Sequence, residues 1–394
     1  MNYLRIGTEY FRTVKKPLLS GDTVKEIVKW KKSEIITDHG KDYLCQIKKY
    51  DGFTLIPSHT NYQPVIKHFY NKYEKVEHEL VRGDFEETMS YLKHIFGEQF
   101  ELGLDYLTIL WKYPTQVLPI LSLVSSERNT GKTTFINFLK LIFQNNLTIN
   151  TNEEFRGRFN SDWTSKLLIC IDEVLLEKRE DSERLKHLST ATSFKSESKG
   201  VDKIEDSFYG KFILCSNNEE TFINVDQGEI RYWVIKVHPF KVENTMLLKK
   251  LKSELPAFMY FLNRRHIMSP KTSRMWFSPK QIRTKALEKL MRGNQDYLII
   301  EIKECLMDDF AKFEAVKLCY TSSDLVEKLK ANNVRATANK ISSTIKRNLG
   351  IESINSSYFK YYLSRNVSLN DFSIEKEMFK GRYYEFEKSQ IESI

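Results

Sequence analysis

Short apolar runs recur through the middle of the chain. Their residue ranges are 118–124, 166–171, 211–215 and 232–235. Apolar runs of this length, without alternation, are typical of strands that are buried on both faces of a parallel sheet. The pattern therefore predicts an α/β core between residues 118 and 265.

Helical periodicity marks the segments on either side of this core. Apolar positions repeat at helical spacing in 84–96, in 103–113 and again in 246–261. Residues before 84 mix short strand-like runs with glycines and charged turns, which predicts a small α+β region. We therefore divide the chain into an α+β region (1–83), a helical lead-in that would pack subunits together (84–117), the core (118–265), a linker helix (266–294) and a C-terminal domain (295–394).

The C-terminal domain shows a different order of elements. Helical patterns at 297–310, 321–329 and 337–349 precede two strand-like runs at 358–363 and 382–386. A helix, a turn, a second helix and two strands form the outline of a winged helix. Such a domain contacts either DNA or other proteins, and the sequence leaves both open.

Ser126 to Thr133 has the form of a phosphate-binding loop between the first apolar run and a helix. Backbone N–H groups around Gly131 would point at phosphate oxygens at a helix N-terminus. Lys132 would reach the β- and γ-phosphates, and the Thr133 hydroxyl would hold Mg²⁺. The loop departs from the usual pattern at Ser126, where glycine is expected. The predicted nucleotide-binding residues are Ser126, Asn129, Thr130, Gly131, Lys132, Thr133 and Thr134.

Polar residues follow the later runs and supply candidate catalytic groups. Asp172 would hold Mg²⁺, and Glu173 would polarise the attacking water as a general base. Asn217 is the candidate that senses the γ-phosphate, with Asn218 as an alternative. Arg231 is the candidate that stabilises transition-state charge on a neighbouring subunit's nucleotide. The competing arginines are Arg128, Arg156 and Arg158.

Taken in order, these motifs resemble a superfamily 3 helicase, and more narrowly the primase-helicase proteins of phages, plasmids and integrated mobile elements. The resemblance runs from about residue 118 to 240. It implies an AAA+-like core, ATP and Mg²⁺ as cofactors, a hexameric ring around DNA and 3′-to-5′ unwinding. It also implies a DNA-contacting hairpin, which here corresponds to a segment carrying Lys195, Lys199 and Lys203. A helix face and an ordinary solvated surface are the alternatives for those lysines.

Composition narrows the class of protein further. The net charge of +9 suits a polyanionic partner such as single-stranded or forked DNA. Five widely spaced cysteines include no Cys-x-x-Cys pair, and no apolar stretch reaches membrane-spanning length. We therefore expect a cytoplasmic protein with no membrane partner. Residues 1–110 lack paired metal-binding acids, so we expect a primase to lie either on a separate replication protein, as a partner, or on a part of the natural chain upstream of residue 1.

Three functions fit the sequence. The first is an ATP-dependent DNA helicase of a replicating mobile element. The second is a different ATPase of the same class, which opens an origin or packages DNA. The third is a replication scaffold that binds nucleotide without turnover, although Lys132, Asp172 and Glu173 argue against it.

Overall fold

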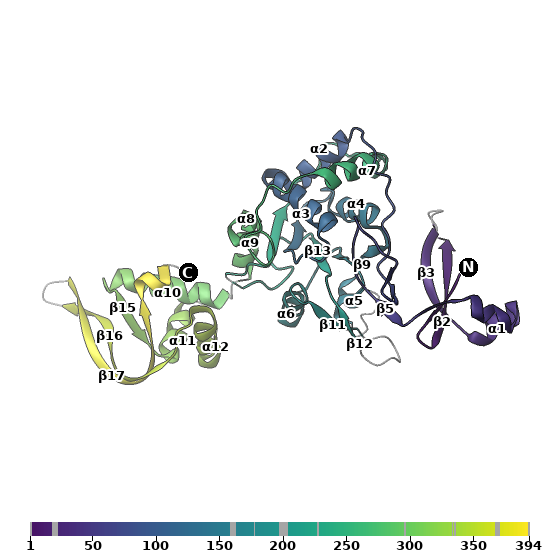
Figure 1. Ribbon diagram of the computed structural model, residues 1–394. Coiled ribbons are helices and arrows are strands. Elements are labelled where there is room, and N and C mark those ends of the chain that lie inside the picture. The colour runs from purple at the N-terminus through teal and green to yellow at the C-terminus, as the bar shows by residue number, and fades with distance from the viewer. Residues whose placement is uncertain are drawn as a thin grey trace. The chain divides into compact units, whose positions relative to one another are not determined.

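The computed structural model describes residues 2–17, 23–157, 163–176, 178–196, 204–226, 228–294, 297–332, 334, 336–366 and 371–392. The chain forms two compact units, Met1–Asn294 and Gln295–Ile394. Figure 1 shows their elements. Each unit is described by itself. Within the described residues, no helix combines the length and the apolar character that crossing a membrane requires.

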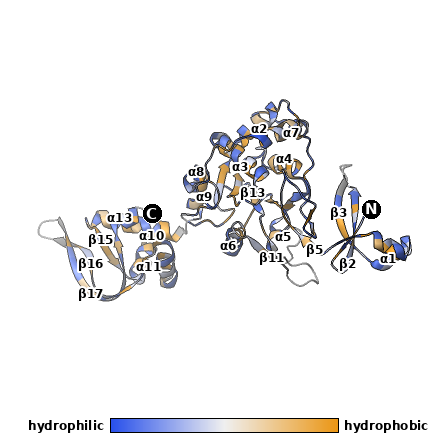
Figure 2. Cartoon of the chain, in the orientation of Figure 1, coloured by the Kyte–Doolittle hydropathy of each residue, from blue (hydrophilic) through white to orange (hydrophobic). Residues whose placement is uncertain are grey.

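A five-stranded sheet forms the centre of the first unit. Its strands are β8 (Ile120–Val124), β9 (Leu147–Asn150), β10 (Leu168–Ile171), β13 (Lys211–Ser216) and β14 (Tyr232–Lys236). They lie in the order β14-β8-β13-β10-β9, and every pair is parallel. The predicted parallel sheet is confirmed, and Figure 2 shows its apolar strands among more polar surroundings. The strand β9 was not predicted.

The two faces of this sheet pack into separate apolar clusters. One cluster takes Leu121, Leu123 and Ile213 from the strands and packs them against α2 (Glu86–Phe96), α3 (Phe100–Lys112), α4 (Lys132–Phe143) and α7 (Leu247–Arg264). The other takes the alternate strand residues, with α5 (Asn152–Arg156), α6 (Arg179–Leu188) and α9 (Lys285–Gly293). The short α8 (Pro279–Ile282) precedes α9. Both faces of the strands are therefore dry, which explains why the runs lack polar alternation.

Residues 1–83 form two small sheets. The first has the order β3-β2-β1-β4, with β1 at Tyr3–Ile6, β2 at Glu9–Pro17, β3 at Thr23–Trp30 and β4 at Lys48–Tyr50. The helix α1 (Lys32–His39) and a 3₁₀-helix (Lys41–Gln46) follow β3, and Ile35 packs with Tyr3 in a small cluster. The second sheet joins β5 (Gly52–Thr54), β6 (Val65–Ile66) and β7 (Phe69–Asn71).

His59 ties this region to the core. Its ring nitrogens lie 2.8 Å from the carbonyl oxygen of Trp111 and 2.6 Å from the hydroxyl of Tyr73. Burial lowers the pKa of His59 to about 4, against an ordinary value of 6.5. Between these two pH values the unfolded chain binds a proton that the folded chain does not, so stability falls as the pH drops.

We expect acidification from pH 6.5 to 4 to lower the free energy of unfolding through His59 by up to about 3 kcal/mol. His59→Gln should flatten this pH dependence, measured by urea unfolding at a series of pH values. His266→Gln, a change at an exposed histidine, should leave the dependence unaltered. An equal slope in wild type and His59→Gln would contradict the assignment.

The segment with the three candidate DNA-contacting lysines lies partly outside the described residues. Two antiparallel strands, β11 (Ser193–Ser196) and β12 (Ile204–Ser207), pair in register around it. Lys195 belongs to β11, whereas Lys199 and Lys203 lie outside the described residues. The described residues 193–196 are therefore strand rather than helix.

The second unit contains the predicted helices and a three-stranded antiparallel sheet. Its helices are α10 (Tyr297–Lys312), α11 (Ser322–Ala331), α12 (Ala338–Thr344), a π-helical turn (Ile345–Leu349) and α13 (Lys388–Glu392). Its sheet has the order β15-β17-β16, with β15 at Lys317–Tyr320, β16 at Ile354–Asn366 and β17 at Asp371–Glu387. The two predicted strands are longer than the sequence suggested, and β15 was missed. The winged-helix assignment stays a prediction.

Candidate functional site

A pocket of about 770 Å³ opens beyond the carboxyl ends of β8, β10 and β13. Polar side chains from the loop after β8, from the start of α4 and from the turns after β10 and β13 converge on it, because the ends of parallel strands share one edge of the sheet. The predicted residues that line it are Asn129, Thr130, Gly131, Lys132, Thr133, Thr134, Asp172, Glu173 and Asn217. The structure thus brings together groups that are up to 88 positions apart in the printed sequence.

The loop before α4 adopts two left-handed backbone conformations. Asn129 has φ 54° and Gly131 has φ 86°, and Gly131 immediately precedes the first turn of α4. A side chain at Gly131 would be strained, and its Cβ would lie 2.9 Å from the ring of Phe240. Glycine is therefore required here for backbone conformation and for close approach.

Lys132 is buried in the pocket wall. Only 7 % of the residue is exposed, and its Nζ donates a hydrogen bond to Thr130 Oγ1 at 3.1 Å. Burial lowers the pKa of Lys132, and the nearby carboxylates of Asp172 and Glu219 oppose that effect. A buried ammonium with incomplete charge compensation favours an anionic ligand.

Thr133 and Asp172 meet directly. The Thr133 hydroxyl donates to Asp172 Oδ2 at 2.9 Å, although β13 lies between the strand that carries the loop and the strand that carries the acid. The other carboxylate oxygen of Asp172 accepts the backbone N–H of Glu173 at 3.1 Å. A hydroxyl beside a carboxylate is a ligand set that suits Mg²⁺.

Glu173 has a left-handed backbone, with φ 55°. Its carbonyl accepts a hydrogen bond from Asn152 Nδ2 at 3.1 Å, and Asn152 Oδ1 accepts the backbone N–H of Leu175 at the same distance. A residue other than glycine in this conformation costs free energy, and such residues cluster at functional sites. The strain places Glu173 at the pocket edge rather than continuing β10.

The two neighbouring asparagines behave differently. Asn218 Oδ1 accepts the backbone N–H groups of Glu220 and Thr221, both at 2.9 Å, so its side chain holds the turn after β13. Asn217 lines the pocket instead. This geometry favours Asn217 over Asn218 as the candidate sensor.

Aromatic residues that the sequence analysis did not single out form one wall of the pocket. The rings of His94 and Phe240 stack with centroids 4.0 Å apart and an interplanar angle of 13°. His94 Nε2 lies 3.1 Å from the carbonyl oxygen of Thr130, and the Tyr91 hydroxyl donates to the Gly131 carbonyl at 2.9 Å. These contacts attach α2 to the loop, and no motif in the sequence marks them.

Ser126, which the sequence predicts to bind nucleotide, lies outside this pocket lining. Its backbone N–H and its hydroxyl both donate to Glu219 Oε1, at 3.0 and 3.2 Å. Lys236 and Lys289 form ion pairs with the same carboxylate, at 3.0 and 2.9 Å. Burial alone would raise the pKa of Glu219, but the hydrogen bonds from Lys289, the Ser126 N–H and Lys236 lower it to about 2. The serine hydroxyl thus gives the loop an anchor that glycine would lack.

We expect Glu219→Gln to lower the free energy of unfolding by about 1.5–3 kcal/mol, because Lys236 and Lys289 lose the carboxylate that neutralises them. The folded-state pKa of Glu219 is depressed, so its contribution is complete above pH 4.5 and is lost as the pH falls towards 2. Urea unfolding should therefore show a difference that shrinks over this range. The matched control, Glu220→Gln, removes a carboxylate that is 54 % exposed and should cost about 0–1 kcal/mol. Equal losses in the two variants would refute the anchor.

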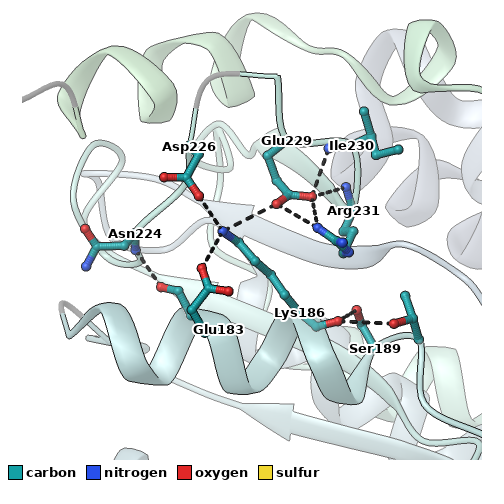
Figure 3. Close-up of polar contacts among 10 residues, drawn as sticks. Glu183, Lys186, Ser189, Asn224, Asp226, Glu229, Ile230 and Arg231 are labelled. Carbon is teal, nitrogen blue, oxygen red and sulfur yellow. Dashed lines mark hydrogen bonds and ion pairs between the residues drawn. The ribbon is translucent and has the colours of Figure 1, made fainter. Parts of the chain in front are cut away.

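Arg231 lies outside the pocket lining, at the start of β14. Its guanidinium group donates to both carboxylate oxygens of Glu229, at 2.9 and 3.0 Å. Glu229 in turn lies 3.5 Å from the ammonium of Lys186 in α6, which also pairs with Glu183 and Asp226 (Figure 3). A role in trans remains a prediction for Arg231.

The competing arginines have different surroundings. Arg128 lines the pocket. Arg156 is held by Asp181, with its Nε 2.8 Å from the carboxylate, and by the carbonyl of Leu175. Arg158 lies outside the described residues.

Fold and pocket together define a mixed α/β protein with polar groups gathered at the carboxyl edge of a parallel sheet. Residues 123–231 match a family model described as a family of unknown function (DUF5906). No curated protein matches the chain.

Three solved structures of the C-terminal region of NrS-1 are similar to this chain. The apo structure of residues 305–718 has a TM-score of 0.66 at 12 % identity, and the match covers 97 % of this chain and 95 % of that one. An A-form apo structure has a TM-score of 0.64 at 13 % identity, covering 90 % and 92 %. Another A-form structure has a TM-score of 0.64 at 12 % identity, covering 98 % and 96 %. At these identities the similarity shows a shared fold.

Proposed function

We propose that the protein is an ATP-dependent DNA helicase that acts in the replication of a phage, plasmid or integrated mobile element. The observation that carries this proposal is the convergence of Lys132, Thr133, Asp172, Glu173 and Asn217 on one pocket. The pocket volume lies in the range of small-molecule sites. The similarity to the NrS-1 region extends over nearly the whole chain, so the two proteins share a fold beyond the pocket as well.

Each pocket residue has a chemical role in this proposal. Lys132 binds the β- and γ-phosphates as the countercharge that its burial favours. Thr133 and Asp172 would hold Mg²⁺, which neutralises charge on the phosphates. Glu173 accepts a proton from the attacking water, and Asn217 orients that water or the γ-phosphate.

The helicase assignment adds two features that lie beyond one chain. Subunits assemble into a ring, in which Arg231 would reach the nucleotide of a neighbouring subunit. The segment between β11 and β12 contacts the phosphate backbone of DNA, so its affinity carries little sequence preference and falls with salt.

The deciding experiment measures ATP hydrolysis with and without single-stranded DNA, followed by unwinding of a forked duplex. Hydrolysis that rises with DNA, together with strand separation, is the expected result. Hydrolysis that does not respond to DNA, without unwinding, would contradict the helicase proposal and support another ATPase of this class. Nucleotide binding without hydrolysis would support the scaffold.

A further inference from the structure

The first sheet of residues 1–83 carries an unusual concentration of positive charge. Strands β1 to β4 contain eight basic and two acidic residues, a net charge of +6, whereas the whole chain has +9. The basic residues are Arg5, Arg12, Lys15, Lys16, Lys25, Lys29, Lys48 and Lys49. Most of the chain's excess charge therefore resides in one small sheet that the proposed ATPase site does not use.

The basic side chains have different surroundings on the two faces of this sheet. On one face, the Arg12 guanidinium lies 5.4 Å from the ring centroid of Tyr3 and 4.9 Å from that of Trp30. Tyr3 belongs to the cluster that contains Ile35 of α1, and Trp30 packs against it. The aromatic rings thus engage Arg12 within the packed face.

The other face presents lysines to solvent. Register places Leu4, Phe11 and Lys48 side by side on β1, β2 and β4, and alternation puts Lys15 on the same face. Lys15 pairs directly with Lys25 across β2 and β3. Lys15, Lys25 and Lys48 are exposed, and none forms an ion pair with another described residue. We call Lys15, Lys25 and Lys48 with Phe11 and Phe53 the lysine face.

Two properties of the lysine face lower the stability of the folded chain when nothing is bound to that face. Like charges directly opposite each other on antiparallel strands are destabilising, and Lys15 and Lys25 have this arrangement. Aromatic rings are also left partly exposed. Phe11 and Phe53 meet edge to face with centroids 5.2 Å apart, and Lys72 Nζ lies 4.5 Å from the Phe53 ring centroid. A polyanion with planar bases would compensate both costs.

We propose that the lysine face is a binding site for single-stranded nucleic acid, separate from the segment between β11 and β12. The lysines neutralise backbone phosphates, and the phenylalanine rings provide apolar surface for bases. Sheets that combine aromatic rings with basic side chains bind single strands in this way, because every base has a π-face. The site does not depend on nucleotide hydrolysis.

The test uses neighbouring lysines on opposite faces of the same strands. Lys15→Ala/Lys48→Ala removes two charges from the lysine face, and Lys16→Ala/Lys49→Ala removes two from the packed face. The full-length chain, without nucleotide, is titrated into a fluorescent oligothymidylate at several salt concentrations. We expect the first variant to bind about tenfold more weakly at low salt, with a salt slope shallower by about 1.4, and the control to bind like wild type.

Further measurements identify the class of ligand and check that the variants remain folded. Oligouridylate distinguishes RNA from DNA, and the single strand should outcompete blunt duplex and anionic lipid vesicles. Lys15→Arg/Lys48→Arg should restore binding, and both alanine variants should keep the wild-type basal rate of ATP hydrolysis, measured without DNA. Unchanged binding in Lys15→Ala/Lys48→Ala, an equal loss in the control, or preference for duplex or vesicles would overturn the proposal. A protein that binds the oligomer through this face but hydrolyses no ATP would refute only the proposed function.

Discussion

Replacing Glu173 with Gln is expected to lower the rate of ATP hydrolysis about a hundredfold to ten-thousandfold, while nucleotide still binds. Gln has nearly the same shape as Glu but accepts no proton from water at neutral pH. The left-handed backbone at Glu173 and its hydrogen bond from Asn152 involve main-chain atoms, so they tolerate the change. Phosphate release and binding of a fluorescent ATP analogue separate the two effects.

The matched control for this variant is Glu243→Gln. Glu243 also lines the pocket, but it is exposed and lies in the segment before α7. Hydrolysis in Glu243→Gln should stay close to the wild-type rate. Normal hydrolysis in Glu173→Gln would remove Glu173 from the chemical step and leave the base unassigned.

Lys132→Ala is expected to reduce hydrolysis by about a hundredfold to a thousandfold and to weaken nucleotide binding as well. The ammonium group is the buried cation beside the loop, and no other lysine lines this pocket among the described residues. Loss of binding distinguishes this variant from Glu173→Gln, whose defect lies in the chemical step. Steady-state hydrolysis and the same fluorescent titration measure the contrast.

The stability of Lys132→Ala should not fall with its activity. Burial already lowers the pKa of Lys132, which means that the folded state holds this charge at a cost. We therefore expect an unchanged or higher free energy of unfolding in urea. Lys249→Ala, a change at an exposed lysine of α7, should alter neither activity nor stability. An Lys132→Ala protein that is inactive because it unfolds would argue for a structural lysine.

At Ser126, the contact that the structure shows differs from the contact that the motif alone suggests. The motif gives Ser126 a direct place in the nucleotide site, because the first loop position normally approaches phosphate. In the structure the Ser126 hydroxyl instead binds Glu219, a residue 93 positions later in the chain. Two lysines from different elements hold that carboxylate, and no local pattern in the sequence links them.

Local sequence determined the elements and their chemistry. Unbroken apolar runs predicted the buried strands because both of their faces must be dry. The Gly131-Lys132-Thr133 motif predicted a loop before a helix because only glycine adopts the required backbone without strain. The sequence also predicted that Asp172 and Glu173 lie at the carboxyl end of a buried strand, because the apolar run before them ends where the charged residues begin.

Tertiary structure decided what those elements meet. The insertion of β13 between β8 and β10, and the contact between Thr133 and Asp172 across it, depend on strand order, which short apolar runs do not encode. The stacking of His94 on Phe240 and the pairing of Lys15 with Lys25 depend likewise on register and packing. Periodicity specifies which face of a segment is apolar, whereas the free energy of packing the whole chain selects the partner of that face.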